Sequence, residues 1–367
     1  MKILLFHLSG TPLYAAEIAH SLADKGHNVH AIVAQRNLNE DFFDENIYIN
    51  PIGISTNLKT LLRCLNPLTY VRIIKQIKTI DPDVIHITQG FLWLNPVLPF
   101  ISEYPILYTD HEPEEVNDVT LYDRTNIYSF SKSHMRRYAD KIIVHGDYLK
   151  EILLSRGIPE DKVVVISHGT YRYYEEVDNG EDTDSMPNNN VLFFGLLADY
   201  KGISVLAKAI PQIRNRCPEA TFTIAGKGDI DSYMPDNLLK EDYITIYNEF
   251  IPDERVGPLF RNAEIVVLPY TSGSQSGVLT ISYQFKTPVV VTNVGSLPEA
   301  VDNHETGIIV PPNEPDLLSE GICRILSSSR TQKNMEQAIT EKVESELSWD
   351  IICNNLIELY SDLSDDH

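Results

Sequence analysis

Cysteine and positive charge are both scarce in this chain. Its four cysteines, Cys64, Cys217, Cys323 and Cys353, form no CxxC pair and no spacing of metal ligands, so we interpret them as free thiols in a reducing compartment. Lysine and arginine number 30 against 52 acidic residues, which gives a formal net charge of −22. Because no excess of basic surface is available for phosphate contacts, we expect no nucleic acid as a bulk partner.

The sequence also lacks a hydrophobic run long enough to span a membrane. The first apolar run, Ile3 to Phe6, is too short for the core of a signal peptide and is better interpreted as a strand. No internal repeat of solenoid period is found. Together with the free thiols, these absences favour a cytoplasmic protein. At about 150 residues per domain, 367 residues predict two domains, and 43% apolar residues suffice for their cores.

Short apolar segments alternate with amphipathic ones along the chain, which predicts strands connected by helices. The expected strands include 2–8, 27–33, 83–88, 106–108 and 142–144 in the first half, and 191–195, 221–225, 243–247, 265–268 and 288–292 in the second. Helices are expected at 13–25, 147–156, 203–214 and 348–363. The acidic, turn-rich segment 175–190 between the halves predicts a surface connection.

The stretch from Ile265 to Glu299 carries the clearest functional signal. A buried strand is followed by a loop of small residues at 271–277, by a segment of helical spacing and by a second strand. A helix N-terminus presents unpaired N–H groups with a partial positive charge, and small residues leave room for a phosphate. Ligands of doubly wound sheets bind in such loops, so the loop is a candidate phosphate site. An ordinary turn without a ligand has the same composition.

This stretch resembles the donor-binding region of the GT-B glycosyltransferases of retaining family 4 (glycosyl transferases group 1). The family pattern is Pro-Ser-x-x-Glu-Gly-Phe-Gly, Glu-Ala-Met-Ala-x-Gly-x-Pro-Val-Val and Gly-Gly-x-x-Glu. Four elements of this pattern occur in the sequence at the expected spacing: Pro269, Pro-Val-Val at 288–290, Gly295 and Glu299. Gly273 and Ile281 stand in place of two glutamates of the family's Glu-x7-Glu signature. The variant Ser-Gln-Ser-Gly-Val-Leu resembles one branch of the family.

Two further segments resemble donor-binding loops of the family. In its Gly-Arg-Leu-x-x-x-Lys-Gly pattern the arginine and the lysine bind the donor diphosphate, and here Lys201 is kept while Leu196 replaces the arginine. The Gly-x-Gly near the nucleotide base corresponds to 226–228. Lys201 and the backbone amides of 276–278 are then expected to stabilise the leaving diphosphate. The implied donor-binding residues are Gly195, Lys201, Gly226, Gly228, Gln275, Ser276, Gly277, Val278 and Glu299.

The first half resembles the family's acceptor-binding domain. The segment 108–111, Tyr-Thr-Asp-His, resembles the active-site histidine segment, and His111 is the predicted catalytic residue beside Lys201. Gly10 and Thr11 lie in the loop after the first strand, which in the family faces the cleft. His86 resembles the histidine of Asp-x-Ile-His and is also assigned to the acceptor or cleft side, although a histidine inside a strand is more often a core residue.

The resemblance implies an α/β GT-B fold, in which two Rossmann-like doubly wound domains face a cleft and a C-terminal helix crosses back to the first domain. The corresponding boundaries are 1–174 for the acceptor-binding domain, 175–190 for the connection, 191–345 for the nucleotide-sugar-binding domain and 346–367 for the last helix. It implies a hexosyltransferase that moves a sugar from a nucleotide-diphosphate donor to a glycan or lipid-linked acceptor. The reaction would proceed with retention and without a bound metal or other cofactor.

Two other functions stay open. A non-catalytic GT-B subunit that binds a partner enzyme is suggested by the missing arginine at Leu196 and the two missing glutamates. The retention of His111, Lys201 and Glu299 weighs against that hypothesis. A GT-B sugar-nucleotide epimerase is the second alternative, and it would need no acceptor.

The segment 55–80 stands out in so acidic a chain because it carries only basic charges. Its cations are Lys59, Arg63, Arg72, Lys75 and Lys78, and leucines and isoleucines accompany them. Such a segment is typical of a helix that meets anionic lipid at the inner face of a membrane, and equally of packed helices with a solvated basic face. Asn66-Pro67 predicts a break within it.

Overall fold

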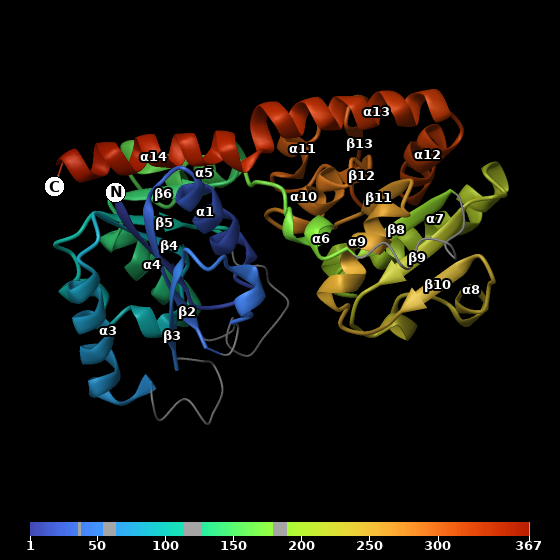
Figure 1. Cartoon of the computed structure of the whole chain (residues 1–367). Helices are drawn as coiled ribbons and strands as arrows, with labels where there is room; N and C mark the ends of the chain where they lie inside the picture. Colours follow the sequence, from blue (N-terminus) through green and yellow to red (C-terminus); the bar gives the residue numbers. More distant parts are fainter. Residues whose placement is uncertain (36–37, 54–63, 114–126, 179–188, 367) are drawn as a thin grey trace. The chain divides into compact units, whose positions relative to one another are not determined.

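The structure is a computed structural model that describes residues 1–35, 38–53, 64–113, 127–178 and 189–366 (Figure 1). The chain forms two compact units, which we call unit 1 (Met1–Ser167 with Trp349–His367) and unit 2 (His168–Ser348). The division after Ser167 comes earlier than the predicted boundary at 174. The reason is local packing, because Tyr171 and Tyr174 pack against the apolar core of unit 2.

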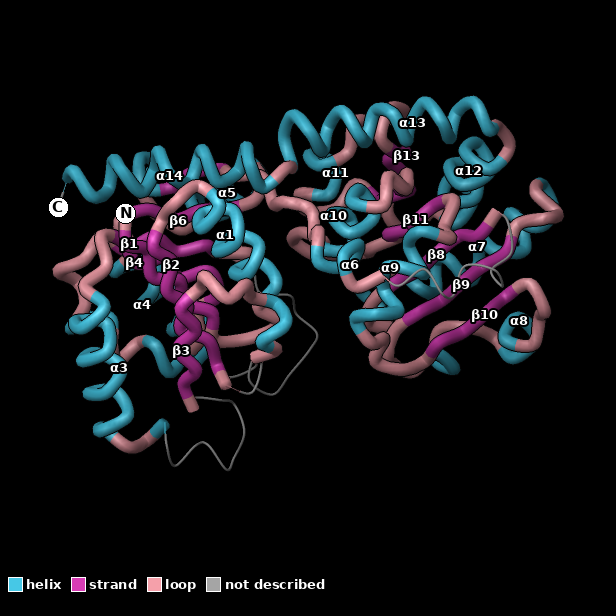
Figure 2. Tube along the Cα trace, viewed as in Figure 1, coloured by secondary structure: helices cyan, strands magenta, loops and turns pink. Residues whose placement is uncertain are grey.

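Unit 1 is built on a parallel sheet with strand order β3-β2-β1-β4-β5-β6-β7 (Figure 2). The strands are β1 (Lys2–His7), β2 (Asn28–Ala34), β3 (Tyr48–Ile52), β4 (Val84–Gln89), β5 (Ile106–Thr109), β6 (Lys141–Val144) and β7 (Val163–Val165). Its α-helices are α1 (Leu13–Asp24), α3 (Pro67–Ile80), α4 (Ile127–Tyr138), α5 (Asp147–Ser155) and α14 (Trp349–Asp366). The strand order reverses between β1 and β4, and ligands of doubly wound sheets bind at that point.

Unit 2 contains a second parallel sheet, with strand order β10-β9-β8-β11-β12-β13. The strands are β8 (Asn190–Phe194), β9 (Thr221–Ala225), β10 (Ile244–Tyr247), β11 (Ile265–Leu268), β12 (Val289–Thr292) and β13 (Gly307–Val310). The α-helices are α6 (Tyr173–Glu176), α7 (Ile203–Arg216), α8 (Asp236–Leu239), α9 (Asp253–Arg261), α10 (Gly277–Gln284), α11 (Leu297–Ala300), α12 (Pro315–Leu326) and α13 (Ser329–Lys342). Here the order reverses between β8 and β11, so the loops after these strands are the expected ligand-binding edge.

The C-terminal helix α14 packs on α1 and β4 of unit 1, which confirms the predicted return of the chain to its first domain (Figure 1). The Trp349 ring meets the edge of Tyr14 with ring centres 5.6 Å apart. Tyr360, fully buried on the same helix, places its hydroxyl 2.7 Å from Nδ1 of His86. Aromatic packing and this buried polar contact therefore fix the helix to the sheet.

His86 is a core residue, so its prediction as an acceptor or cleft residue is wrong. The side chain is fully buried inside β4, and its Nε2 lies 2.7 Å from the Thr109 hydroxyl. Burial lowers the pKa of His86 to about 3. With both ring nitrogens bonded inside the protein, the residue serves packing rather than substrate binding.

The basic segment contains α3, whose start at Pro67 confirms the predicted break at Asn66-Pro67. The Asn66 side chain caps the helix by accepting a hydrogen bond of 3.0 Å from the Leu68 amide. Lys59 and Arg63 lie outside the described residues. In the described part of the chain, every helix is too short or too polar to cross a membrane.

His86 makes the stability of unit 1 sensitive to acid. Its pKa in the folded protein lies below the ordinary value, so below about pH 6.5 unfolding takes up a proton at this site. Its contribution is complete above about pH 6.5 and is lost toward pH 3, at about 1.4 kcal/mol per pH unit. We therefore expect the unfolding free energy of the wild type to fall more steeply from neutral to acid pH than that of His86→Gln.

Urea unfolding followed by tryptophan fluorescence measures this difference, since both tryptophans, Trp93 and Trp349, belong to unit 1. Equal slopes for the wild type and His86→Gln would contradict the assignment.

Candidate functional site

The loops that follow β8, β9 and β11 touch one another at one edge of the unit 2 sheet. Gly226 has a φ of +149°, and a Cβ there would overlap the carbonyl oxygen of Gly195. Gly202 has a φ of +71°, and a Cβ there would overlap the carbonyl oxygen of Pro269. Glycine is therefore required at both positions for the backbones to approach so closely.

A chain of polar contacts connects two of these loops. The Lys201 amine donates a hydrogen bond of 2.7 Å to the hydroxyl of Tyr270. The same hydroxyl lies 2.7 Å from Oγ of Ser276, the residue that precedes α10. Tyr270 is only 2% exposed, so its position is set by packing. This arrangement places a lysine charge beside a helix N-terminus, and both features favour phosphate groups.

The other predicted donor-binding residues are distributed around this contact. Val278 lies in the first turn of α10 and approaches Gly195, and Gln275 and Gly277 flank Ser276. The Gly228 amide donates a hydrogen bond of 3.0 Å to Asn248, farther along the same edge. Glu299 is exposed on α11, and the loop before it is bonded to the Ser274 carbonyl through Ser296. Most of the predicted donor-binding residues therefore lie close to the contact of Lys201 with Tyr270: Gly195, Lys201, Gly226, Ser276, Gly277 and Val278. Gly228 and Glu299 lie farther from this contact.

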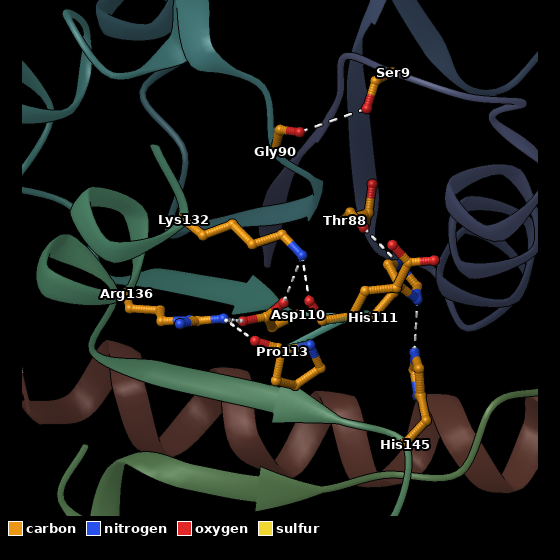
Figure 3. Close-up of polar contacts among 10 residues, drawn as sticks. Ser9, Thr88, Gly90, Asp110, His111, Pro113, Lys132, Arg136 and His145 are labelled. Atoms are coloured by element: carbon orange, nitrogen blue, oxygen red, sulfur yellow. Dashed lines mark hydrogen bonds and ion pairs between the residues drawn. The ribbon is translucent and has the colours of Figure 1, made fainter. Parts of the chain in front are cut away.

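In unit 1 His111 follows β5 directly and is held by two partners (Figure 3). Its Nε2 donates a hydrogen bond of 2.9 Å to the Thr88 carbonyl, and its Nδ1 lies 2.9 Å from Nε2 of His145. Nδ1 of His145 donates in turn to the Ile166 carbonyl at 2.9 Å. Carbonyl oxygens only accept, so both outer nitrogens carry hydrogen, and the bond between the rings needs a third proton. A hydrogen bond between the two rings would therefore require one of them to be protonated.

A second charged group lies next to His111 and consists of Asp110, just after β5, with Lys132 and Arg136 of α4 (Figure 3). Asp110 is fully buried and accepts hydrogen bonds from Arg136, at 2.7 Å from Nε and 2.6 Å from the terminal nitrogen. The amine of Lys132 lies 3.7 Å from the other oxygen of Asp110 and donates to the carbonyl of Glu112. Asp110, Glu112 and Lys132 line a pocket of about 130 Å³, together with His111.

The remaining predicted residues of unit 1, Gly10 and Thr11, are exposed in the loop after β1. Ser9 in the same loop donates a hydrogen bond of 3.5 Å to the Gly90 carbonyl, so this loop meets the loop after β4 (Figure 3). Four site residues were not predicted from the sequence: Tyr270, Lys132, Arg136 and His145. Of these four, only Lys132 and Arg136 could have been found from the sequence, because they are four residues apart and so share one face of a helix.

The chain thus consists of two parallel doubly wound units, which is the architecture of the GT-B fold. Residues 188–328 match the family described as glycosyl transferases group 1, and residues 8–171 match glycosyltransferase family 4. The chain belongs to this family of GT-B glycosyltransferases.

Known relatives span nearly the whole chain. An uncharacterised glycosyltransferase of Methanocaldococcus jannaschii is 26% identical over 96% of this chain and 94% of its own length. The sucrose-phosphate synthase of Thermosynechococcus elongatus has a similar fold, with a TM-score of 0.76 at 18% identity over 100% of both chains. HepE of Anabaena, solved with UDP and glucose, has a TM-score of 0.74 at 16% identity over 99% of this chain and 100% of its own.

The Tyr270 hydroxyl is expected to position both Lys201 and Ser276 for phosphate binding. Tyr270→Phe keeps the buried ring but removes the hydroxyl, so we expect about tenfold weaker binding of a nucleoside diphosphate. Tyr283→Phe is the matched control, because this buried hydroxyl of α10 bonds Thr306 instead. The dissociation constants of both variants are measured by calorimetric titration with whichever of UDP, GDP and ADP binds the wild type most tightly. Equal affinities of Tyr270→Phe and the wild type would contradict the proposed positioning.

Proposed function

We propose that this glycosyltransferase moves a hexose from a nucleotide-diphosphate donor to a glycan or lipid-linked acceptor, with retention and without a bound metal. The observation that carries the proposal is the contact of Lys201 with Tyr270 and Ser276 at the N-terminus of α10. In the transition state negative charge develops on the leaving diphosphate. A lysine and the amides of 276–278 stabilise that charge without rearrangement, because the fold already holds them in place.

The sequence lacks the arginine that the family places before the lysine, and Leu196 at that position is 43% exposed. Lys201 and the backbone N–H groups therefore have to neutralise the diphosphate. Glu299, exposed on α11, is assigned to hydroxyl groups of the sugar or the ribose. Gly226 and Gly228 are assigned to the side of the base.

Unit 1 is assigned to the acceptor. His111 is expected to contact the reacting sugar or the acceptor, and its bonds to Thr88 and His145 fix the orientation of the ring. Gly10 and Thr11 border the same edge of the sheet.

The nature of the donor is supported by a structural relative. HepE of Anabaena, which shares the fold, was solved with UDP and glucose. UDP and UDP-sugars are therefore the first ligands to test, followed by GDP, ADP and their sugars.

A thermal-shift screen of these nucleotides tests the donor assignment. A ligand at about a hundred times its dissociation constant adds about 2.7 kcal/mol of stability, so we expect a clear shift with one base. Lys201→Ala should abolish most of that shift, whereas Lys208→Ala, an exposed lysine of α7, should keep it. Absence of a shift with every nucleotide would favour a non-catalytic subunit. Equal shifts in Lys201→Ala and the wild type would place the donor elsewhere.

We further propose that α3 contacts an anionic membrane surface. Ile73, Ile77 and Ile80 bury one face of this helix in unit 1. On the outside, Leu68, Val71 and the nearby Phe100 are 61%, 57% and 61% exposed. Val71 and Phe100 line a pocket of about 650 Å³, together with Lys75 and Lys78. Exposed apolar groups among lysines are typical of helices that lie in a lipid interface.

Liposome flotation tests the membrane contact. Replacing Arg72, Lys75 and Lys78 with glutamine should reduce flotation with anionic vesicles severalfold, because each basic residue contributes about 1 kcal/mol near such a surface. The control replaces three exposed lysines of unit 2 with glutamine: Lys208, Lys240 and Lys333. Unchanged flotation of the α3 variant would refute the contact.

A further inference from the structure

Two cysteines of unit 2, Cys217 and Cys323, lie on neighbouring helices. Cys217 directly follows the last residue of α7, and Cys323 lies in the last turn of α12. The two helices pack side by side in unit 2 (Figure 1). Cys323 is part of an apolar cluster, and Cys217 packs against that cluster. Tertiary packing therefore holds the two thiols in one region, although they are far apart in the sequence.

Polar contacts fix the register of these two helices. Gln212 of α7 donates a hydrogen bond of 2.6 Å to the carboxylate of Asp316 on α12. One turn further along both helices, the Arg216 guanidinium lies 3.6 Å from the carboxylate of Glu320. Because both contacts advance by four residues, α7 and α12 run in the same direction with these residues aligned. The next turn of α12, which contains the buried thiol, therefore lies beside the end of α7.

Ser327 shows directly how close the Cys217 thiol lies to this turn. The Ser327 hydroxyl is 3.7 Å from Sγ of Cys217. The Ser327 amide donates a hydrogen bond of 3.0 Å to the carbonyl of Cys323, so these two residues are one turn apart on the same side of the helix. Cys217 therefore packs against the side of α12 that carries Cys323.

The two thiols are in contact, and both are reduced in this structure. Burial, followed by a hydrogen bond with the Cys217 thiol, raises the pKa of the Cys323 thiol to about 11. Cys323 is therefore protonated at neutral pH, and a protonated thiol is a poor nucleophile. This explains why the pair stays reduced until an oxidant reaches it.

The exposure of the two thiols decides which one an oxidant meets first. Cys323 is only 8% exposed, whereas Cys217 is half-buried at the end of its helix. A reagent from solution therefore reacts with Cys217, and Cys323 is positioned as the thiol that reacts second, inside the protein. Disulfide exchange proceeds in these two steps, through a mixed disulfide.

We propose that Cys217 and Cys323 are a redox modification site, which closes to a disulfide by exchange with a small-molecule disulfide such as oxidised glutathione. The Cys217 thiolate attacks one sulfur of the small molecule, releases one small thiol and carries the other half as a mixed disulfide. The Cys323 thiolate then attacks the Cys217 sulfur and releases the second small thiol. The protein thiols lose two electrons and two protons, and the two released thiols take them up.

The disulfide fastens the C-terminal end of α7 to α12. It stabilises unit 2, because it constrains the unfolded chain across a long loop. Lys201 lies before the opposite end of α7, about 20 Å away at about 1.5 Å per helical residue, so the nucleotide-binding edge is unaffected. The inference goes beyond the proposed function and does not depend on it.

Treatment of the folded, full-length protein with oxidised glutathione tests the inference. We expect the thiols counted after unfolding to fall from four to two, and mass spectrometry to find the peptides of Cys217 and Cys323 linked within one molecule. The melting temperature should rise by about 5 °C or more. Dithiothreitol should reverse both changes.

Single alanine variants assign the two steps. Cys323→Ala should stop at the mixed disulfide on Cys217, and Cys217→Ala should form neither the mixed disulfide nor the link at this site. Cys64→Ala and Cys353→Ala are the matched controls, because they leave the pair intact, and both should form the same link as the wild type.

Three outcomes would overturn the inference. A mixed disulfide that persists on Cys217 of the wild type would show that Cys323 cannot reach it. Four remaining thiols, or a link between two molecules, would show that the pair does not close. A lower melting temperature of the linked protein would show that the disulfide strains unit 2 instead of fastening it. Nucleotide binding is measured in both redox states and should be equal.

Discussion

The proposed nucleotide-binding edge of the unit 2 sheet depends on two close backbone contacts. Gly202 packs against the Pro269 carbonyl, and Gly226 packs against the Gly195 carbonyl. Without side chains at these positions, the loops after β8, β9 and β11 approach closely enough for Lys201 to reach Tyr270. Tyr270 is buried, so the lysine charge and the start of α10 are fixed together before any ligand arrives. Preorganised charge of this kind acts at full strength because no rearrangement is needed during the reaction.

Unit 1 uses buried charge in a different way. The histidine pair and the group of Asp110, Lys132 and Arg136 lie at the ends of β5 and β6 and on α4, where packing holds them rigidly (Figure 3). Buried ions are costly unless they are paired, and here Arg136 pairs with Asp110 at 2.6 Å. The histidine pair and Asp110 lie just past the carboxyl ends of parallel strands, where ligands of doubly wound sheets bind.

Much of the fold could be predicted from the sequence, because strands buried on both faces are apolar throughout. The strand 265–268 is an example, and it was predicted with the bounds that β11 has. The edge strand β3 was missed because Ile52 is its only buried residue and it contains Pro51, so no apolar run marks it. His111 and Lys201 were found through family motifs. Tyr270 and Lys132 were missed because their roles depend on contacts over long sequence separations, 69 residues between Lys201 and Tyr270.

The central claim is that the protein catalyses sugar transfer. The most direct test measures the release of nucleoside diphosphate from a nucleotide sugar, with the nucleotide sugar that the protein binds most tightly as substrate. The account predicts turnover by the wild type that an acceptor accelerates. It also predicts at least a hundredfold loss in Lys201→Ala, which removes the charge beside the leaving diphosphate, and in His111→Ala, which removes the residue assigned to the reacting sugar or the acceptor. If the wild type binds the nucleotide sugar but never cleaves it with any acceptor, the protein is a non-catalytic member of its family and the account of catalysis is wrong.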